Sequence, residues 1–107
     1  MSQAIVVQTT TGSRADAEQL AEILVQHALA GCVQITGPIT SVYRWQGTVQ
    51  KDEEFLLSIK TIEQAFTPLA DLIRKHHSYE VPEIIALPIT FGGSDYLAWL
   101  AEQITTE

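Results

Sequence analysis

Residues 31–61, GCVQITGPITSVYRWQGTVQKDEEFLLSIKT, contain two β-rich runs separated by the turn sequence WQGT at 45–48. Two such runs joined by a few residues that include glycine are typical of a β-hairpin. Gly37 and Pro38 interrupt the first run, which predicts a bulge or a position at the edge of a sheet. The stretch therefore predicts the hairpin around which the rest of the chain is arranged.

The second run of this hairpin has two unlike faces, because the side chains of a strand alternate from one side to the other. One face is apolar and carries Phe55, Leu57 and Ile59. The opposite face is mixed and carries Glu54, Leu56, Ser58 and Lys60. We expect a helix to cover the first face and something else to cover the second.

A strand and a helix are predicted before the hairpin. Residues 4–10, AIVVQTT, form a short β-rich segment. Ser13 and Asp16 then form an acidic capping box, which marks the start of a helix, and Gly31 is a suitable stop. The apolar stripe of this helix comprises Ala17, Leu20, Ala21, Leu24 and Ala28.

A second helix, a strand and a short third helix are predicted after the hairpin. The second helix covers 63–77, with Thr61 and Gln64 as its capping box. Residues 83–90, EIIALPIT, resemble a buried strand, and Ser94 caps the final helix. The apolar surface of that final helix is supplied by Tyr96, Leu97, Trp99 and Leu100.

The order β-α-β-β-α-β followed by a terminal helix predicts the α+β class with a ferredoxin-like fold. In that arrangement one antiparallel sheet carries both main helices on one face. A chain of 107 residues is the size of one domain, so residues 1–107 are predicted to form a single domain. The uncovered sheet face carries apolar groups, which indicates a partner, and closed self-association is the commonest solution.

Composition and charge narrow the classes of partner. The net charge is −7, from six Lys and Arg against thirteen Asp and Glu, which argues against nucleic acid and mildly favours cationic partners such as metal ions. No segment approaches the roughly 20 apolar residues that cross a bilayer, so no membrane insertion is expected. The start MSQAIVVQTTTG lacks the features of a signal peptide, so a cytoplasmic location is expected. Cys32 is the single cysteine, which excludes an intrachain disulfide.

Uncommon combinations of residues occur in two stretches of the chain, 31–61 and 76–100. The second stretch reads HHSYEVPEIIALPITFGGSDYLAWL. The groups concerned are Cys32, Ser41 with Tyr43, Trp45 with Gly47, Glu54, Lys60 with Thr61, His77 with Tyr79, Pro82 with Glu83, and Tyr96 with Trp99. Their order and spacing resemble those of the CutA family of divalent-cation tolerance proteins. The resemblance runs from the first predicted strand to the last helix, which is nearly the whole chain.

The resemblance implies more than the spacing does. Members of the CutA family are ferredoxin-like homotrimers whose sheets pack around a three-fold axis, and their architecture is similar to that of the PII signalling proteins. They are linked to tolerance of copper and other divalent cations, copper binding has been proposed for them, and no catalytic reaction is established. The resemblance therefore implies a homotrimer that is not an enzyme and whose only cofactor is a weakly bound Cu²⁺ or other divalent cation.

This chain departs from the family pattern at two positions. Thr9, within QTTT at 8–11, stands where some relatives have a cysteine in a proposed metal site, so a soft copper ligand is missing. Ser78 stands where the family usually has proline, which changes only local stiffness because proline fixes φ.

The stretch HHSYEVPEI at 76–84 is the candidate metal site. Adjacent residues of a helix do not face the same way, so His76 and His77 are not expected to hold one ion together. Either could pair with Glu83 after the following turn, and imidazole with carboxylate suits copper, zinc or nickel. The alternative is structural: a histidine that ends the helix, packs on Tyr79 and bonds to the backbone.

Two further hypotheses concern Cys32 and the charged residues of the second run. The Cys32 thiol could bind a soft metal or act as a nucleophile with His77 as its base, or it could be a small buried hydrophobe. Glu54 and Lys60 lie six residues apart, about 20 Å along a strand, so each is either solvated or meets a neighbouring subunit.

Four aromatic residues lie near turns and element ends, namely Tyr43, Trp45, Tyr79 and Trp99. They could form a pocket for a small planar or anionic ligand, with Lys60 as counter-charge. They could instead form core and trimer contacts, because tyrosine and tryptophan commonly anchor interfaces.

These observations predict a cytoplasmic homotrimer that binds divalent cations, copper among them, and takes part in the response to metal ions. The alternative is a PII-like signalling trimer that binds a small molecule in an intersubunit cleft and regulates an unidentified protein partner. A hydrolase that uses Cys32 and His77 is a third hypothesis.

Overall fold

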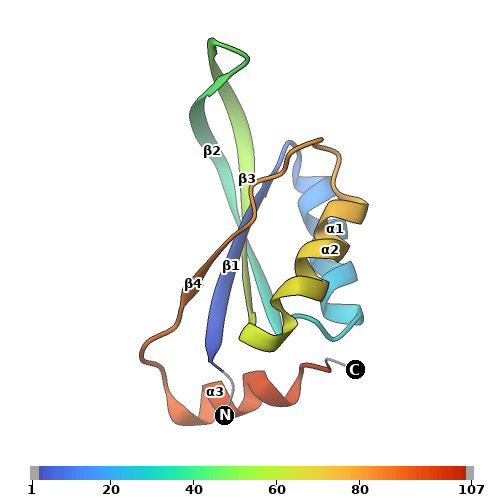
Figure 1. The fold of residues 1–107 in the computed structure, drawn as a ribbon, viewed down its shortest axis with the longest axis vertical. Coiled ribbons are helices and arrows are strands. Elements are labelled where there is room, and N and C mark those ends of the chain that lie inside the picture. The colour runs from blue at the N-terminus through green and yellow to red at the C-terminus, as the bar shows by residue number, and fades with distance from the viewer. Residues whose placement is uncertain (1–2, 106–107) are drawn as a thin grey trace.

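Four antiparallel strands form one sheet in the order β2-β3-β1-β4, and two helices cover one of its faces (Figure 1). The computed structural model describes residues 3–105. The elements in chain order are β1 Ala4–Thr11, α1 Arg14–Gln26, β2 Cys32–Trp45, β3 Thr48–Ile62, a 3-10 turn Glu63–Ala65, α2 Phe66–His76, β4 Ile85–Pro88 and α3 Ser94–Glu102. This order and the antiparallel pairing confirm the predicted α+β ferredoxin-like fold.

The core lies between the sheet and the helices α1 and α2. Leu57 and Ile59 of β3 are fully buried there, which confirms the apolar face predicted for this strand. Burying a large aliphatic side chain contributes roughly 1.5–3 kcal/mol. The same cluster also contains Ile5, Val7, Leu20, Leu24, Leu69 and Ile73. None of the helices within residues 3–105 has the length and apolar content needed to cross a bilayer.

The hairpin of β2 and β3 extends well beyond the helices (Figure 1). Its two-residue turn places Gln46 at φ 51° and Gly47 at φ 81°, the left-handed geometry that matches the twist of a hairpin. The register shifts between Thr36 and Ile39, and β2 is an edge strand. The interruption predicted at 37–38 is therefore confirmed as a bulge in an edge strand.

Helix α1 begins where the sequence predicts and ends earlier. The N-cap Ser13 is confirmed, since its Oγ accepts the N–H of the residue three positions later at 3.1 Å. The helix ends at Gln26, and Ala28 rather than Gly31 takes the left-handed conformation, at φ 55°. Gly31 has a different role, because a Cβ atom there would lie 2.6 Å from Leu100 Cδ1. The missing side chain makes room for α3, which lies across the end of the sheet (Figure 1).

Two predicted helix caps are wrong. Thr61 Oγ1 donates to the Leu29 carbonyl at 2.7 Å, and α2 starts after the 3-10 turn without a side-chain cap. Ser94 is the first residue of α3, whose N-cap is Gly93 and has no side-chain hydrogen bond. For Thr61, a carbonyl that is distant in the sequence competes successfully for the hydroxyl.

The last strand is shorter and more exposed than predicted. β4 covers only Ile85–Pro88, and all four of its residues are exposed. It is the outer strand beside β1, while Ile84, just before it, packs against the core cluster. An apolar edge strand and a buried strand have similar sequence patterns, so periodicity alone could not separate them.

Two fully buried threonines give a matched pair of test substitutions. Thr61→Val leaves the Leu29 carbonyl without its donor, and we expect the free energy of unfolding to fall by about 1–3 kcal/mol. The Thr9 hydroxyl has no hydrogen-bond partner, so we expect Thr9→Val to leave the free energy of unfolding unchanged or to raise it. Urea unfolding at one protein concentration measures both, and equal losses in the two variants would contradict these roles.

Candidate functional site

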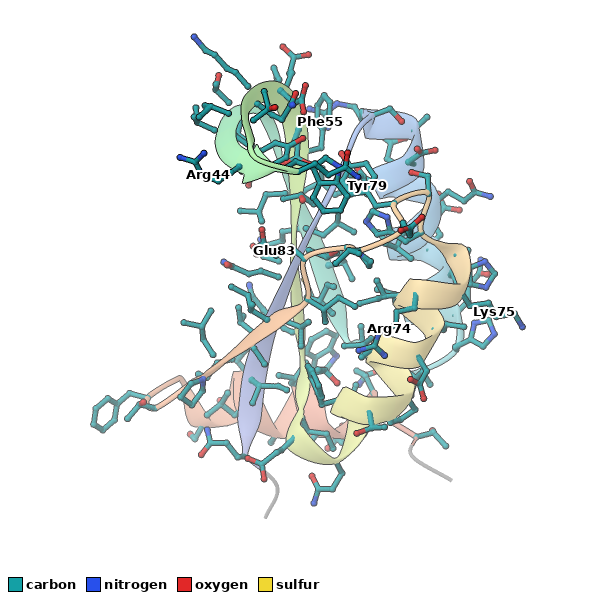
Figure 2. All side chains as sticks on the ribbon, turned by 45° about the horizontal axis from the view of Figure 1, so that its top comes forward. Arg44, Phe55, Arg74, Lys75, Tyr79 and Glu83 are labelled. Atoms are coloured by element: carbon teal, nitrogen blue, oxygen red, sulfur yellow. The ribbon has the colours of Figure 1, made fainter. Side chains whose placement is uncertain are left out.

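A cleft opens between the outer half of the hairpin and the segment that leads from α2 to β4. We call it the hairpin cleft, and its volume is about 670 Å³. Its lining residues are Thr10, Ser41, Val42, Tyr43, Trp45, Glu54, Tyr79, Glu80, Val81, Pro82 and Glu83. Figure 2 labels Tyr79 and Glu83 on the segment that runs beside the hairpin. The structure thus brings together five of the candidate residues, which are Tyr43, Trp45, Glu54, Tyr79 and Glu83.

Two tyrosines of the cleft donate hydrogen bonds to carboxylates of β3. The Tyr79 O–H donates to Glu54 Oε2 at 2.7 Å, and the Tyr43 O–H donates to Asp52 Oδ2. Burial, the bond to Glu54 and nearby negative charge raise the pKa of Tyr79. The pKa of Tyr43 is raised mainly by its bond to Asp52. Both phenols therefore stay protonated at neutral pH and act as donors.

His77 fixes the segment that carries Tyr79. Its Nε2–H donates to the Thr10 carbonyl at 2.7 Å, and its Nδ1 accepts the Tyr79 N–H at 3.0 Å. A carbonyl only accepts and an amide N–H only donates, so these two bonds define the tautomer. The two rings also lie 4.8 Å apart between centroids. His77 is thus arranged as in the structural interpretation, and metal binding through it would require one of the two bonds to break.

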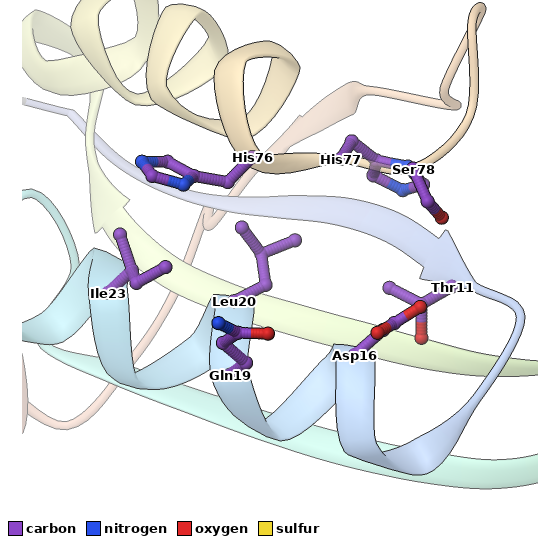
Figure 3. A pocket seen from close by; sticks show the side chains of 8 residues that line it. All are labelled: Thr11, Asp16, Gln19, Leu20, Ile23, His76, His77 and Ser78. Atoms are coloured by element: carbon purple, nitrogen blue, oxygen red, sulfur yellow. The ribbon is translucent and has the colours of Figure 1, made fainter.

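The two histidines and Glu83 lie in different places. His76 and His77 both line a second cavity of about 110 Å³ between α1 and the end of α2, with their rings apart (Figure 3). Glu83 lines the hairpin cleft instead. Within residues 3–105, no three His, Cys, Asp or Glu side chains are grouped as a metal site. The predicted set is therefore not assembled in this arrangement, and metal binding by it stays a prediction.

Cys32 and Lys60 lie at the other end of the sheet, beside α3, which carries Trp99. Cys32 and Lys60 are partners in the register of β2 and β3. Lys60 Nζ lies 6.0 Å from the centroid of the Tyr96 ring, which is 5.6 Å from that of Trp99. Burial and then Cys32 raise the pKa of Tyr96. Lys60 is not among the residues that line the hairpin cleft, so it does not supply the counter-charge expected there.

The nucleophile and base of the hydrolase hypothesis are not brought together. His77 bonds to Thr10, which pairs with Leu56, whereas Cys32 pairs with Lys60. Those two positions of β3 are four residues apart, which corresponds to about 13 Å along the strand. A proton could not pass directly from the thiol to the imidazole over that distance.

The sequence interpretation missed Asp52, although strand register carries a signal for it. The two-residue turn pairs Trp45 with Thr48 and Tyr43 with Gln50. Asp52 is then the next residue on the Tyr43 face of β3, within diagonal reach of a long side chain. Counting outward from the turn therefore identifies the partner of Tyr43.

The fold and the cleft define a class of protein, a ferredoxin-like α+β domain with a long hairpin that carries an acidic and aromatic cleft. The family model of the CutA1 divalent ion tolerance protein matches residues 5–103. The chain belongs to this family, as the sequence resemblance predicts.

Relatives in bacteria and plants agree with this assignment. The chain is 47% identical over 97 residues to the divalent-cation tolerance protein CutA of Thermus thermophilus, covering 91% of this chain and 94% of that protein. It is 49% identical over 96 residues to a chloroplastic CutA protein of Arabidopsis thaliana, covering 90% of this chain and 53% of that longer protein. It therefore spans about half the length of the Arabidopsis relative. The crystal structure of CutA1 from Oryza sativa superimposes with a TM-score of 0.96 at 40% identity, covering 99% of this chain and 97% of that one.

The raised pKa of Tyr79 has a measurable consequence at alkaline pH. Its ordinary value is 10.0, and the folded protein holds the phenol proton more tightly than the unfolded chain does. Stability from this group is therefore complete below about pH 10 and is lost as the pH rises towards the folded value. We expect the free energy of unfolding to fall more steeply above about pH 10 in the wild type than in Tyr79→Phe. Urea unfolding measures the slopes, and equal slopes for wild type and Tyr79→Phe would contradict the expectation.

Proposed function

We propose that this protein acts in the cytoplasm as a homotrimer in the cellular response to divalent cations, copper among them. The observation that carries the proposal is the set of large apolar side chains that the single chain leaves exposed on its hairpin, β4 and α3. The family name and the Thermus relative both refer to tolerance of divalent ions. Binding rather than catalysis is proposed, because Cys32 and His77 are held apart on the sheet.

The uncovered apolar surface follows the hairpin, β4, α3 and the segments that lead to them. Phe91 is 92% exposed and Val49 is 62% exposed. Ile85, Leu87, Tyr96 and Trp99 are further large apolar side chains in it, whereas the exposed residues Val42, Tyr43, Trp45 and Val81 line the adjoining hairpin cleft. Such a patch marks an interaction site, and every copy of the chain offers the same patch, so closed self-association covers it most simply. The resemblance to trimeric relatives favours three copies.

We expect the protein to have three times the mass of one chain in solution at micromolar concentration. Leu87→Lys places a charge in the uncovered apolar surface, so it should shift the protein towards the monomer. Val25→Lys is the matched control, because Val25 is a similarly exposed apolar residue of α1 outside that surface. Light scattering after size-exclusion chromatography gives the masses, and a monomeric wild type would contradict the trimer.

The charge of the hairpin cleft supports direct contact with cations. Glu54, Glu80 and Glu83 line it, and none of the six Lys and Arg residues of the chain does. No soft ligand is available at position 9, because this chain has threonine where some relatives have a cysteine. The Thr9 side chain is also fully buried. We therefore propose weak binding of Cu²⁺ or another divalent cation through Glu83, with His76 or His77 as the nitrogen ligand after a local rearrangement.

Calorimetric titration of metal-free protein with Cu²⁺ tests this contact. We expect saturable binding of about one ion per chain that is at least about tenfold weaker in Glu83→Ala, and weaker in either His76→Ala or His77→Ala. Glu18→Ala, on the exposed side of α1, is the control and should bind as the wild type does. Weak binding that is the same in every variant would contradict direct metal binding by these residues.

The hairpin cleft also favours a second function, that of a PII-like signalling trimer. Small-molecule sites commonly have volumes of roughly 300–1,000 Å³ and combine aromatic walls with a few polar groups. The hairpin cleft, at about 670 Å³, has three aromatic residues and three glutamates in its lining. A ligand bound there would contact the hairpin, which projects beyond the helices (Figure 1). The hairpin could then signal to a protein partner whether the cleft is occupied.

A further inference from the structure

We infer that the hairpin cleft binds a small organic ammonium ion, a quaternary or methylated amine, between its aromatic rings and Glu54. This inference rests on the second proposed function, ligand binding in the cleft, and names the class of ligand. The sequence predicted a planar or anionic ligand for these aromatic residues, with Lys60 as counter-charge, and the organic ammonium ion takes the place of that ligand.

The charge of the cleft is negative, because its lining contains three glutamates and no lysine or arginine. Side chains alternate along a strand, so Arg44 and Lys51 lie on the opposite face of the hairpin from Tyr43. Lys60 shares the face of Glu54 but lies six residues away, about 20 Å along β3. An anionic ligand would therefore be repelled, and a cationic ligand attracted.

Glu54 is the acidic group that most needs a cation. Only 8% of the residue is exposed, and the hydrogen bond that its carboxylate receives comes from the neutral Tyr79 phenol. The ion pair found within residues 3–105 joins Arg74 to Asp71, so no basic side chain of the described chain pairs with Glu54. Glutamates that are almost fully buried are normally paired with a cation. A cation bound in the cleft would complete this site.

The walls of the cleft favour an organic cation over a metal ion. A metal ion needs several oxygen or nitrogen ligands that converge, and among the described residues no three acidic, His or Cys side chains do. Tyr43, Trp45 and Tyr79 instead supply three aromatic rings, which attract ammonium ions through their faces. Because the two phenols donate to Asp52 and Glu54, their rings are held at the hydroxyl end and become richer in electrons.

The fluorescence of Trp45 tests the inference directly. The chain has two tryptophans, so Trp99→Phe leaves Trp45 as the single reporter once the oligomeric state of the variant has been checked. This protein is titrated with tetramethylammonium chloride, with sodium chloride at the same ionic strength, and with tert-butanol as an uncharged molecule of similar size. We expect a saturable change with tetramethylammonium and binding at least about tenfold weaker for tert-butanol.

Variants in the same background assign the binding to named groups. Glu54→Gln keeps the shape of the side chain and removes its charge, so it should weaken tetramethylammonium binding about tenfold. Because Glu54 is buried, Tyr43→Leu serves as a second variant that removes an exposed ring, and it should weaken binding as well. Glu18→Gln, on the exposed side of α1, is the matched control and should bind as the parent does. Circular dichroism verifies that each variant is folded.

Four outcomes would overturn the inference, and they separate its failure from that of the proposed functions. Equal binding of tert-butanol, or tighter binding of benzoate as a planar anionic probe, would show that the cleft binds a ligand but that the ligand is of another chemical class. No response to any probe, together with Cu²⁺ binding that is lost in Glu83→Ala, would reject the cleft function and leave the metal function. If the monomeric Leu87→Lys variant binds tetramethylammonium and the wild type does not, a second copy of the chain fills the cleft in the wild type.

Discussion

β3 is hydrogen-bonded on both sides, to β1 and to β2, so the alternation of its side chains decides where the rest of the chain lies. Its inward residues Leu57 and Ile59 belong to the core under α1 and α2. The opposite face of β3 carries polar side chains, with Glu54 in the hairpin cleft and Lys60 beside α3. A shift of one residue in this register would exchange the two faces, so the same pairing determines both stability and the candidate site.

A chain of hydrogen bonds provides the second constraint, because the segment after α2 must pass the end of β1 before it joins β4. His77 is bonded to Thr10, Tyr79 to His77, and Glu54 to Tyr79. Gly12 allows a close approach of Tyr79, since a Cβ atom there would lie 3.3 Å from Tyr79 Oη. A histidine that resembles a metal ligand in sequence is therefore a support for the wall of the cleft. The structural role of His77 and the binding role proposed for Tyr79 depend on the same bonds.

The two ends of the open sheet face differ in charge and in chemistry. The hairpin end is acidic and aromatic, whereas the α3 end holds the Cys32 thiol beside Lys60 and the Tyr96 ring. Apolar side chains lie exposed at both ends. Self-association through that surface would place the cleft at or near a boundary between subunits. The assembly and the ligand preference proposed for this protein thus both depend on side chains that the single chain leaves exposed.

The sequence by itself determined the features that depend on neighbours along the chain. These include the order of elements, the cap at Ser13, the interruption at 37–38 and the alternation of β3, because capping, turn geometry and the pleat act over a few residues. The tertiary structure decided the hydrogen bonds of Thr61 to Leu29, of His77 to Thr10 and of Lys60 to Gln34, which join residues between 26 and 67 positions apart in the chain. It also decided that an apolar strand lies at the exposed edge of the sheet. Local patterns cannot contain such contacts, because each one forms only after distant segments have paired.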